Sequence, residues 1–267
     1  MKNKSLISII AVVFIAVIAY FGYQTLTNSS NKQSASSDKK VIKVATTGVS
    51  FPGSYKDNSG ELTGFDVAVI KAAADKIGYK TEFTTTSFDG LFGLLTSHKV
   101  DVVASAIAIT DDRKQTYDFS TPYATFQYGV VTKKDSDLQS VDDLNDASIA
   151  ATVGSNQIKV LQNFNDSINI KTYDDREAAL SAVSNGQVDG YSNAKTILSA
   201  IIKQKHLDLK ILDGDIEEEN IAITYNKGEN KELRKKINKA LAELEKDGTI
   251  AKLSKKFFSG IDASYKE

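Results

Sequence analysis

Hydrophobic and polar residues follow two alternating patterns along most of this chain. Short runs of mainly apolar or β-branched residues, typical of strands, fall at residues 41–46, 81–86, 100–109, 148–153, 170–173 and 221–225. Elsewhere apolar residues recur every three or four positions or fill short segments between strands, which predicts helices at 65–77, 90–97, 155–163, 174–185, 231–247 and 250–258. Strands that alternate with helices predict an α/β protein with largely parallel sheets.

Two stretches in different halves of the chain resemble each other. LLTSHKVDVVAS at 94–105 and AVSNGQVDGYSN at 182–193 both read as a helix end, a turn, Val-Asp and a strand. Asp101 and Asp189 occupy the matching position. We interpret this as two similar lobes and not as a short solenoid repeat. The alternative is a chance recurrence of a common helix–turn–strand pattern.

The composition excludes several classes of protein. Lys and Arg number 33 against 34 Asp and Glu, a net charge of -1, which argues against a nucleic-acid binder because such proteins carry a basic stripe. The chain has no cysteine, so disulfides, thiolate metal sites and a cysteine nucleophile are excluded. The two histidines, His98 and His206, lack ligand-like spacing. We therefore expect neither a metal nor a cofactor.

The N-terminal residues predict the compartment. Lys2 and Lys4 precede an apolar run over 6–23, which at about 1.5 Å per residue can roughly cross a bilayer core of about 30 Å. A cleaved signal has a shorter apolar core and a small-residue cleavage site, where this chain has bulky aromatic residues. We favour an uncleaved membrane anchor or signal segment at 1–24 over a cleaved signal; both place the remainder outside the cytoplasm. Residues 25–40, rich in Ser, Asn and Lys, predict a flexible linker.

One arginine stands out as a candidate ligand-binding group. Arg113 ends the sequence ITDDR at 109–113, just inside an expected helix start, and a guanidinium can bind a carboxylate through two parallel hydrogen bonds. Taken alone, the Thr-x-x-Arg pattern favours an exposed arginine paired with Asp111 or Asp112. The following sequence YDFSTPY at 117–123 shifts the balance towards function.

Together these two motifs resemble the extracytoplasmic solute-binding proteins of polar amino-acid ABC importers (family 3 type). The resemblance covers residues 41 to 260, and the segment 247–258 is similar to the cystine-binding branch in particular. It implies a two-lobe periplasmic-binding-protein-like (Venus flytrap) fold with hinge crossovers near 128–131 and 220–223. Lobe 1 would comprise 41–130 and 222–267, and lobe 2 would comprise 131–221.

The resemblance also implies a ligand site between the lobes. Arg113 would hold the α-carboxylate of the ligand, and Phe88 would flank its side chain, unless Phe88 is a core phenylalanine. Ser50 stands where relatives have an aromatic residue, which Phe51 would supply from the next position. Ser155 would offer N–H groups to the carboxylate or merely cap its helix. The expected ligand-binding residues are Phe51, Phe88, Ser105, Ala106, Ala108, Arg113, Thr152, Ser155, Asn156 and Asn193.

The main departure from the family pattern is Ala194. Relatives usually have an acidic residue there, which pairs with the α-ammonium of the ligand. Burying an ammonium without a counter-charge is costly. Three outcomes are therefore open: another acid compensates, Asn193 and backbone carbonyls suffice, or the ligand lacks a free α-amino group.

The function implied by the resemblance is the substrate-binding component of an ABC importer. It would capture cystine or another polar amino acid, close by hinge motion and deliver the ligand to the permease. We expect a monomer that is not an enzyme and binds no nucleic acid. The alternatives are a ligand-binding sensor subunit and a dehydratase-like enzyme, which would need a cleft carboxyl with a raised pKa. Asp89 is the only weak candidate for such an acid, and it reads more readily as a helix cap.

Overall fold

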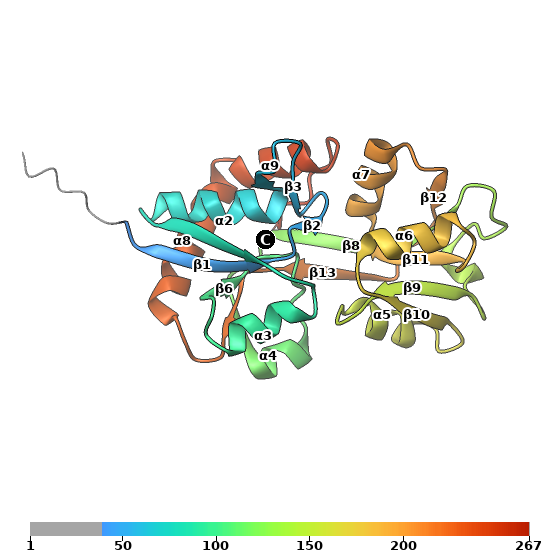
Figure 1. Ribbon diagram of the computed structural model, residues 1–267, viewed down its shortest axis with the longest axis horizontal. Helices are drawn as coiled ribbons and strands as arrows, with labels where there is room; N and C mark the ends of the chain where they lie inside the picture. The colour runs from blue at the N-terminus through green and yellow to red at the C-terminus, as the bar shows by residue number, and fades with distance from the viewer. Residues whose placement is uncertain (1–38, 267) are drawn as a thin grey trace, which may run out of the picture. The chain divides into compact units, whose positions relative to one another are not determined.

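Two α/β lobes are joined by two long strands, as Figure 1 shows. The computed structural model describes residues 39–266, so the expected anchor at 1–24 and the linker residues 25–38 lie outside the described residues. Within residues 39–266, no helix combines the length and apolar character needed to cross a bilayer. The lobe boundaries expected from the sequence stay a prediction.

Lobe 1 is built on a five-stranded sheet in the order β5-β1-β6-β14-β7. Strand β1 is parallel to β5 and β6, whereas β14 is antiparallel to β6 and β7. The strands are β1 Val41–Thr46, β5 Lys80–Thr85, β6 Val102–Val103, β7 Tyr117–Phe119 and β14 Thr224–Asn226. A small antiparallel sheet precedes the first helix and consists of β2 Val49–Ser50, β3 Ser54–Lys56 and β4 Leu62–Thr63.

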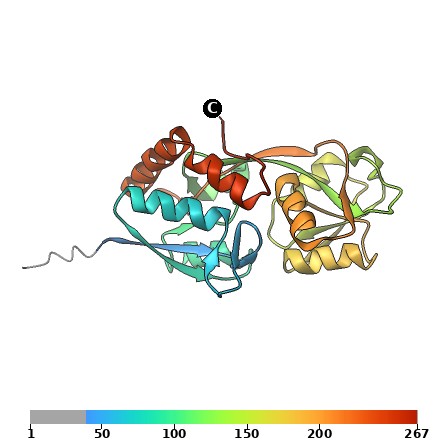
Figure 2. The ribbon, with the colours of Figure 1, turned by 90° about the horizontal axis from the view of Figure 1, so that it is seen from above.

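Five helices cover the lobe 1 sheet. Helices α2, α8 and α9 pack against one another on one side, and α3 and α4 lie on the other (Figure 1). Their bounds are α2 Phe65–Lys76, α3 Gly90–Thr96, α4 Asp111–Thr116, α8 Lys231–Lys246 and α9 Thr249–Phe257. Lobe 1 is thus completed by the C-terminal helices, which Figure 2 shows beside α2.

Lobe 2 contains a six-stranded sheet in which β10, β9 and β11 are parallel and β8 is antiparallel to β11, β12 and β13. Its strands are β8 Ala124–Lys133, β9 Ser148–Thr152, β10 Asn169–Tyr173, β11 Gly190–Ala194, β12 Leu209–Ile211 and β13 Glu217–Ile221. Helices α6 and α7 cover one side and α5 the other (Figure 1). The helices are the short 3-10 helix η2 Val141–Asp143, α5 Gln157–Phe164, α6 Arg176–Ser184 and α7 Lys195–Lys205.

The two aspartates of the sequence repeat have the same structural role. Asp101 Oδ2 accepts a hydrogen bond from Lys43 N in β1 at 2.8 Å, and Asp189 Oδ2 accepts one from Ser148 N in β9 at 2.7 Å. The backbone N–H of each aspartate also donates to the carbonyl oxygen of the same partner at 2.8 Å. The repeat therefore reflects equivalent positions in two lobes and not a chance recurrence.

Two strand predictions were wrong. The apolar run at 100–109 forms a strand only over β6, because Ala106 adopts a positive φ of 52° and the chain beyond it makes only an isolated bridge, from Ala108 to Ile221. The strand expected at 221–225 is two strands, β13 and β14, and β13 begins within the acidic segment 213–219. Although β13 has few apolar residues, its backbone pairing with residues 124–128 of β8 holds it in an extended conformation.

The C-terminal helices belong to the core of lobe 1. Ile237 on α8 is fully buried in the same hydrophobic cluster as α2. Phe258, after α9, packs its ring 4.8 Å from the ring of Phe65 on α2.

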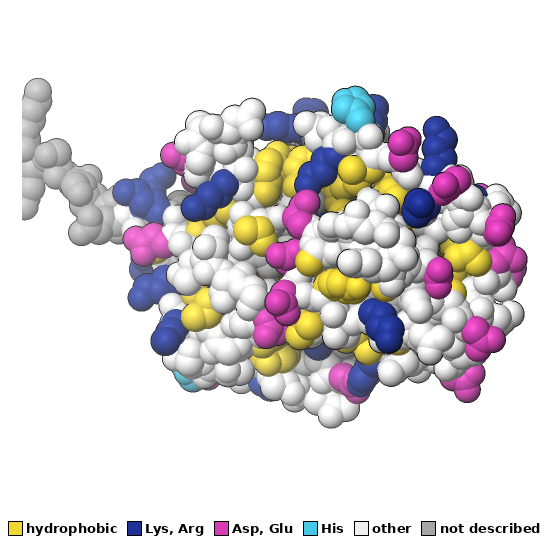
Figure 3. Space-filling view, turned by 45° about the vertical axis from the view of Figure 1, so that its right-hand side comes forward, with side chains coloured by type: hydrophobic (Ala, Val, Ile, Leu, Met, Phe, Trp, Pro, Cys, Tyr) yellow, Lys and Arg dark blue, Asp and Glu magenta, His cyan; other side chains and the backbone are white. Residues whose placement is uncertain are grey.

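On the surface, acidic and basic side chains are interspersed over the face shown in Figure 3.

We expect Ile237→Val to lower the free energy of unfolding by about 1 kcal/mol, because it removes one buried methylene group from this core. Urea denaturation of the unliganded protein measures the change. Lys239→Ala, at an exposed position two residues away on α8, should change stability by less than about 0.5 kcal/mol. Equal effects of both substitutions would contradict the packing of α8 on the lobe 1 core.

Candidate ligand-binding cleft

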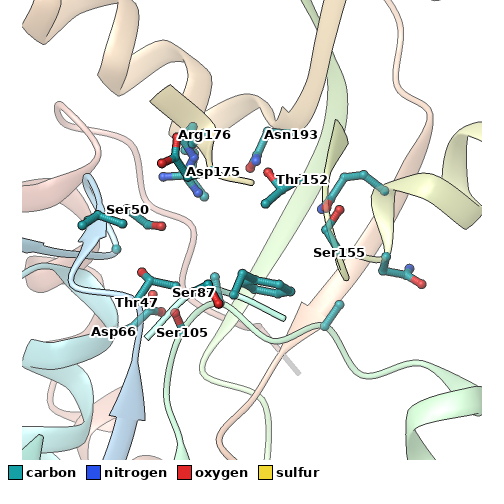
Figure 4. Close-up of a pocket in the computed structure, with 18 of the residues that line it drawn as sticks. Thr47, Ser50, Asp66, Ser87, Ser105, Thr152, Ser155, Asp175, Arg176 and Asn193 are labelled. Carbon is teal, nitrogen blue, oxygen red and sulfur yellow. The ribbon is translucent and has the colours of Figure 1, made fainter. Parts of the chain in front are cut away.

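A cavity of about 280 Å³ is lined by residues of both lobes. Figure 4 shows side chains from the two lobes directed at this space from opposite sides. Nine of the ten residues expected from the sequence line it: Phe88, Ser105, Ala106, Ala108, Arg113, Thr152, Ser155, Asn156 and Asn193. The tenth, Phe51, is not among the lining residues; its ring packs 4.9 Å from that of Tyr55, and Val49 and Ser50 line the cavity instead.

Arg113 is held by the start of α4. Thr110 caps the helix, and its Oγ1 accepts a hydrogen bond from Arg113 N at 3.2 Å. The guanidinium lies 5.2 Å from the centre of the Phe92 ring, and its Nη1 donates to Ala108 O at 3.1 Å. One side of the guanidinium is thereby fixed while the residue still faces the cavity.

The surface alternative for Arg113 was wrong. Asp111 pairs with Lys114 at 3.0 Å, and Asp112 pairs with Lys159 on α5 of lobe 2. Burial lowers the pKa of Arg113, although the guanidinium remains protonated because its ordinary pKa is far above neutrality. A half-buried cation is thus aimed at a cavity between two lobes, where a ligand carboxylate would complete its hydrogen bonds.

Glu219 adds an acidic group behind this arginine. It lies on β13, is 5 % exposed, and its Oε1 accepts a hydrogen bond from Asn156 Nδ2 of lobe 2. Burial raises the pKa of Glu219 above its ordinary value, and the Asn156 hydrogen bond and the charge of Arg113 offset only part of this rise. The strand that joins the lobes therefore carries a carboxyl into the surroundings of Arg113.

The loop between β9 and α5 is available to a ligand. Ser155 Oγ is buried and has no hydrogen-bond partner among the described residues. Asn156 occupies the N-cap position of α5 without a side-chain cap, so the alternative that Ser155 caps the helix was wrong. Gly154 has a φ of 74°, and a Cβ there would lie 3.1 Å from Asp89 Cβ, so a glycine allows the two loops to approach.

Asp66 is a buried acid that the sequence analysis missed. It lies in the first turn of α2, is 3 % exposed and lines the cavity. Tyr123 Oη donates a hydrogen bond to its Oδ1 at 2.6 Å. Burial raises the pKa of Asp66 to about 6, whereas the Tyr123 hydrogen bond acts in the opposite direction. Asp89, which we had considered as the cleft acid, does not line the cavity and makes no side-chain cap bond to α3.

Ala194 and Asn193 are placed at the end of β11. Ala194 is fully buried, so it offers no charge to a ligand. Asn193 lines the cavity, but its Nδ2 donates to Tyr191 Oη at 2.6 Å and its Oδ1 accepts from Ala194 N at 2.8 Å. The amide is thus held in place by neighbours on its own strand, and Asp66 is a buried carboxyl on the opposite side of the cavity.

These features define a two-lobe binding protein of the periplasmic-binding-protein type. Residues 42–260 match the family described as bacterial extracellular solute-binding proteins, family 3, and the chain belongs to that family. Members of this family are extracytoplasmic and deliver their ligands to ABC permeases. The chain is therefore a substrate-binding component of the kind that serves amino-acid importers.

Three proteins that are similar to this chain in sequence or structure are named as amino-acid-binding or cystine-binding proteins. The chain is 43% identical over 263 residues to the probable amino-acid-binding protein YxeM of Bacillus subtilis (strain 168), covering 97% of both chains. It is 34% identical over 271 residues to the L-cystine-binding protein TcyA of the same organism, covering 98% of this chain and 99% of that one. A crystal structure of the ancestral amino-acid-binding protein AncCDT-1, a precursor of cyclohexadienyl dehydratase, superposes with a TM-score of 0.75 at 32% identity, covering 82% and 95%.

Proposed function

We propose that the cleft binds a zwitterionic amino acid, with its α-carboxylate on Arg113 and its ammonium group facing Asp66. The observation that carries this proposal is the half-buried Arg113 guanidinium, which is held on one side by Ala108 O and faces the cavity. In this proposal Asp66, buried and lining the cavity, would supply the negative charge that Ala194 lacks, which is the first of the three outcomes left open by the sequence. The other residues expected from the sequence that line the cavity would form the remainder of the site.

The hydroxyl of Ser155, and not its backbone N–H, supports the carboxylate end of this arrangement, because Ser155 N already donates to Thr152 O at 3.0 Å. Ser155 Oγ, buried and unpartnered among the described residues, lies at the same cavity. The ligand would contact both lobes and so favour the closed form, because only the closed form offers both sets of groups. Cystine is one polar amino acid of suitable charge, as the name of the relative TcyA suggests.

We infer that the protein is a monomeric binding protein and not an enzyme. Its two lobes would lie outside the cytoplasm, joined by the linker at 25–40 to a membrane anchor at 1–24. A dehydratase is the second candidate, because Asp66 is a cleft carboxyl with a raised pKa and AncCDT-1 is a dehydratase precursor. Formation of an aromatic product from a cyclohexadienyl acid, followed by absorbance, would favour the enzyme. We expect no such product.

The decisive experiment is a thermal-shift screen of the purified protein. The panel contains L-amino acids, L-cystine and dicarboxylates that lack an amino group. A ligand present at 100 times its dissociation constant should stabilise the protein by about 2.7 kcal/mol. Stabilisation by amino acids but not by amine-free carboxylates is the expected result. Stabilisation by the amine-free carboxylates alone would contradict the role given to Asp66.

A further inference from the structure

A second arginine lines the same cavity from lobe 2. Arg176 is the first residue of α6, directly after the N-cap Asp175. Figure 4 shows Arg176 and Asp175 together on one side of the cavity, with Asp66 and Ser105 on the other. No motif of the sequence analysis included Arg176, and the proposed function does not use it.

The hydrogen bonds of Arg176 are incomplete. Its Nη1 donates to Phe51 O of lobe 1 at 2.5 Å, whereas its Nε is buried and has no partner among the described residues. Within residues 39–266, no carboxylate lies close enough to Arg176 to form an ion pair. Asp175 Oδ1 instead accepts a hydrogen bond from Ala178 N at 2.9 Å, which caps α6. A buried N–H group without a partner is unfavourable, so a missing acceptor is expected at this point.

The charges of the cavity indicate what the acceptor is. Under the proposed function, Arg113 and Asp66 neutralise the carboxylate and the ammonium of an amino acid. Asp174 and Asp175 also line the cavity, but neither forms an ion pair with Arg176, and the Asp175 carboxylate caps α6. The charge of Arg176 acts on Asp66 across the cavity, and its guanidinium faces the same ligand. A guanidinium with one Nη engaged still presents adjacent N–H donors in a planar fork, a geometry that suits a carboxylate.

We infer that Arg176 forms a second anion subsite, which binds a carboxylate on the side chain of the ligand. This inference rests on the proposed function and narrows it to amino acids that carry a second carboxylate away from the α-carbon. The bond from Arg176 to Phe51 O joins the two lobes at this subsite. Binding of the second carboxylate would therefore order the same side chain that bridges the cleft.

Isosteric probe pairs test the subsite. The pairs are L-glutamate with L-glutamine, and S-carboxymethyl-L-cysteine with S-carbamoylmethyl-L-cysteine, so that each pair differs only in the charge of the side-chain end. Isothermal titration at pH 7.5 should show that the acid of at least one pair binds about tenfold more tightly than its amide. Arg176→Gln should abolish this preference, because it should weaken binding of the acid about tenfold more than binding of its amide.

Two further variants separate the subsite from other effects. Lys203→Gln removes an exposed cation of lobe 2 on α7 and should preserve the preference, and Arg176→Lys should retain part of it because the charge remains. Equal weakening of acid and amide by Arg176→Gln would show that Arg176 only bridges the lobes. That result would overturn the inference. Three other results would also overturn it: the preference is retained in Arg176→Gln, the amides bind more tightly than the acids, or none of the four probes binds. Amino-acid binding that depends on Arg113 would in each case leave the proposed function standing.

Discussion

Arg113→Ala is expected to weaken amino-acid binding by about 30-fold to several-thousand-fold. Removing one partner of a desolvated, hydrogen-bonded charge pair costs about 2–5 kcal/mol, and each 1.4 kcal/mol is a factor of about ten in the dissociation constant. The loss should be large here because the guanidinium is half-buried and fixed by Ala108 O and the Phe92 ring. Isothermal titration with the ligand found in the thermal-shift screen measures it.

The matched control is Arg234→Ala, which removes an arginine of the same lobe. Arg234 Nη1 binds Asp118 Oδ2 at 2.5 Å, and Arg234 is not among the residues that line the cavity, so its loss should leave affinity unchanged. The melting temperature of unliganded Arg113→Ala should stay close to that of the wild type. A variant that instead unfolds without ligand would identify Arg113 as a structural residue and remove the basis of the proposed function.

Asp66→Asn should weaken binding about 30-fold or more at pH 7.5 and abolish its pH dependence. In the wild type, the pKa of Asp66 is raised to about 6, so a ligand ammonium group meets an ionised carboxylate above that pH and a neutral carboxyl below it. Affinity should therefore fall below pH 6 by at most about tenfold per pH unit. Titration calorimetry from pH 7.5 to pH 4.5 measures the profile.

Asp66→Asn, which should weaken ligand binding, should by contrast stabilise the unliganded protein. A carboxyl with a pKa raised from 3.8 to about 6 favours the folded state when protonated, so this contribution is present below about pH 4 and is lost as the pH rises through 6. Asparagine resembles the protonated form, and unliganded Asp66→Asn should gain up to about 3 kcal/mol at pH 7.5. Glu219→Gln is the control for the second buried acid: the pH dependence of binding should survive in it. A flat profile in Glu219→Gln with a normal one in Asp66→Asn would assign the titration to Glu219.

The sequence predicted the parts of the site that local patterns specify. Arg113, which lines the cavity, could be singled out because a capped helix start and a recognisable following segment mark its position. The repeated Val-Asp pattern correctly indicated two similar lobes, since Asp101 and Asp189 bind the first parallel strand of their lobes in the same way. These features depend on residues that are near in sequence or are repeated.

Other site residues could not be found because their role arises only when distant segments meet. Asp66 and Arg176 each lie in the first turn of a helix, where charged residues are common for reasons unrelated to ligands. What distinguishes them is burial against Tyr123 in one case and the contact with Phe51 in the other, and both partners are more than 50 positions away. For Asp66 the available signal was limited to an acid directly after the aromatic residue that begins a helix whose first six residues are otherwise apolar.

Strand β13 was missed because its sequence, EEENI, lacks the alternation of apolar and polar residues that marks a strand. The alternation exists in burial instead: Glu219 and Ile221 are buried, and Glu218 and Asn220 are exposed. Pairing with β8 holds the segment extended, and the buried glutamate is tolerated because Asn156 and Arg113 lie beside it.

The pairing of β13 with β8 sets the register that directs Glu219 inward. Side chains of a strand point alternately to opposite faces, so inserting one residue between Ile216 and Glu219 would exchange the faces of the positions before Glu219. To keep Glu219 near Arg113, the preceding loop would have to absorb the extra length. Strand β13 should therefore tolerate insertions of two residues better than insertions of one. The length of β13 thus determines whether a carboxyl lies beside Arg113.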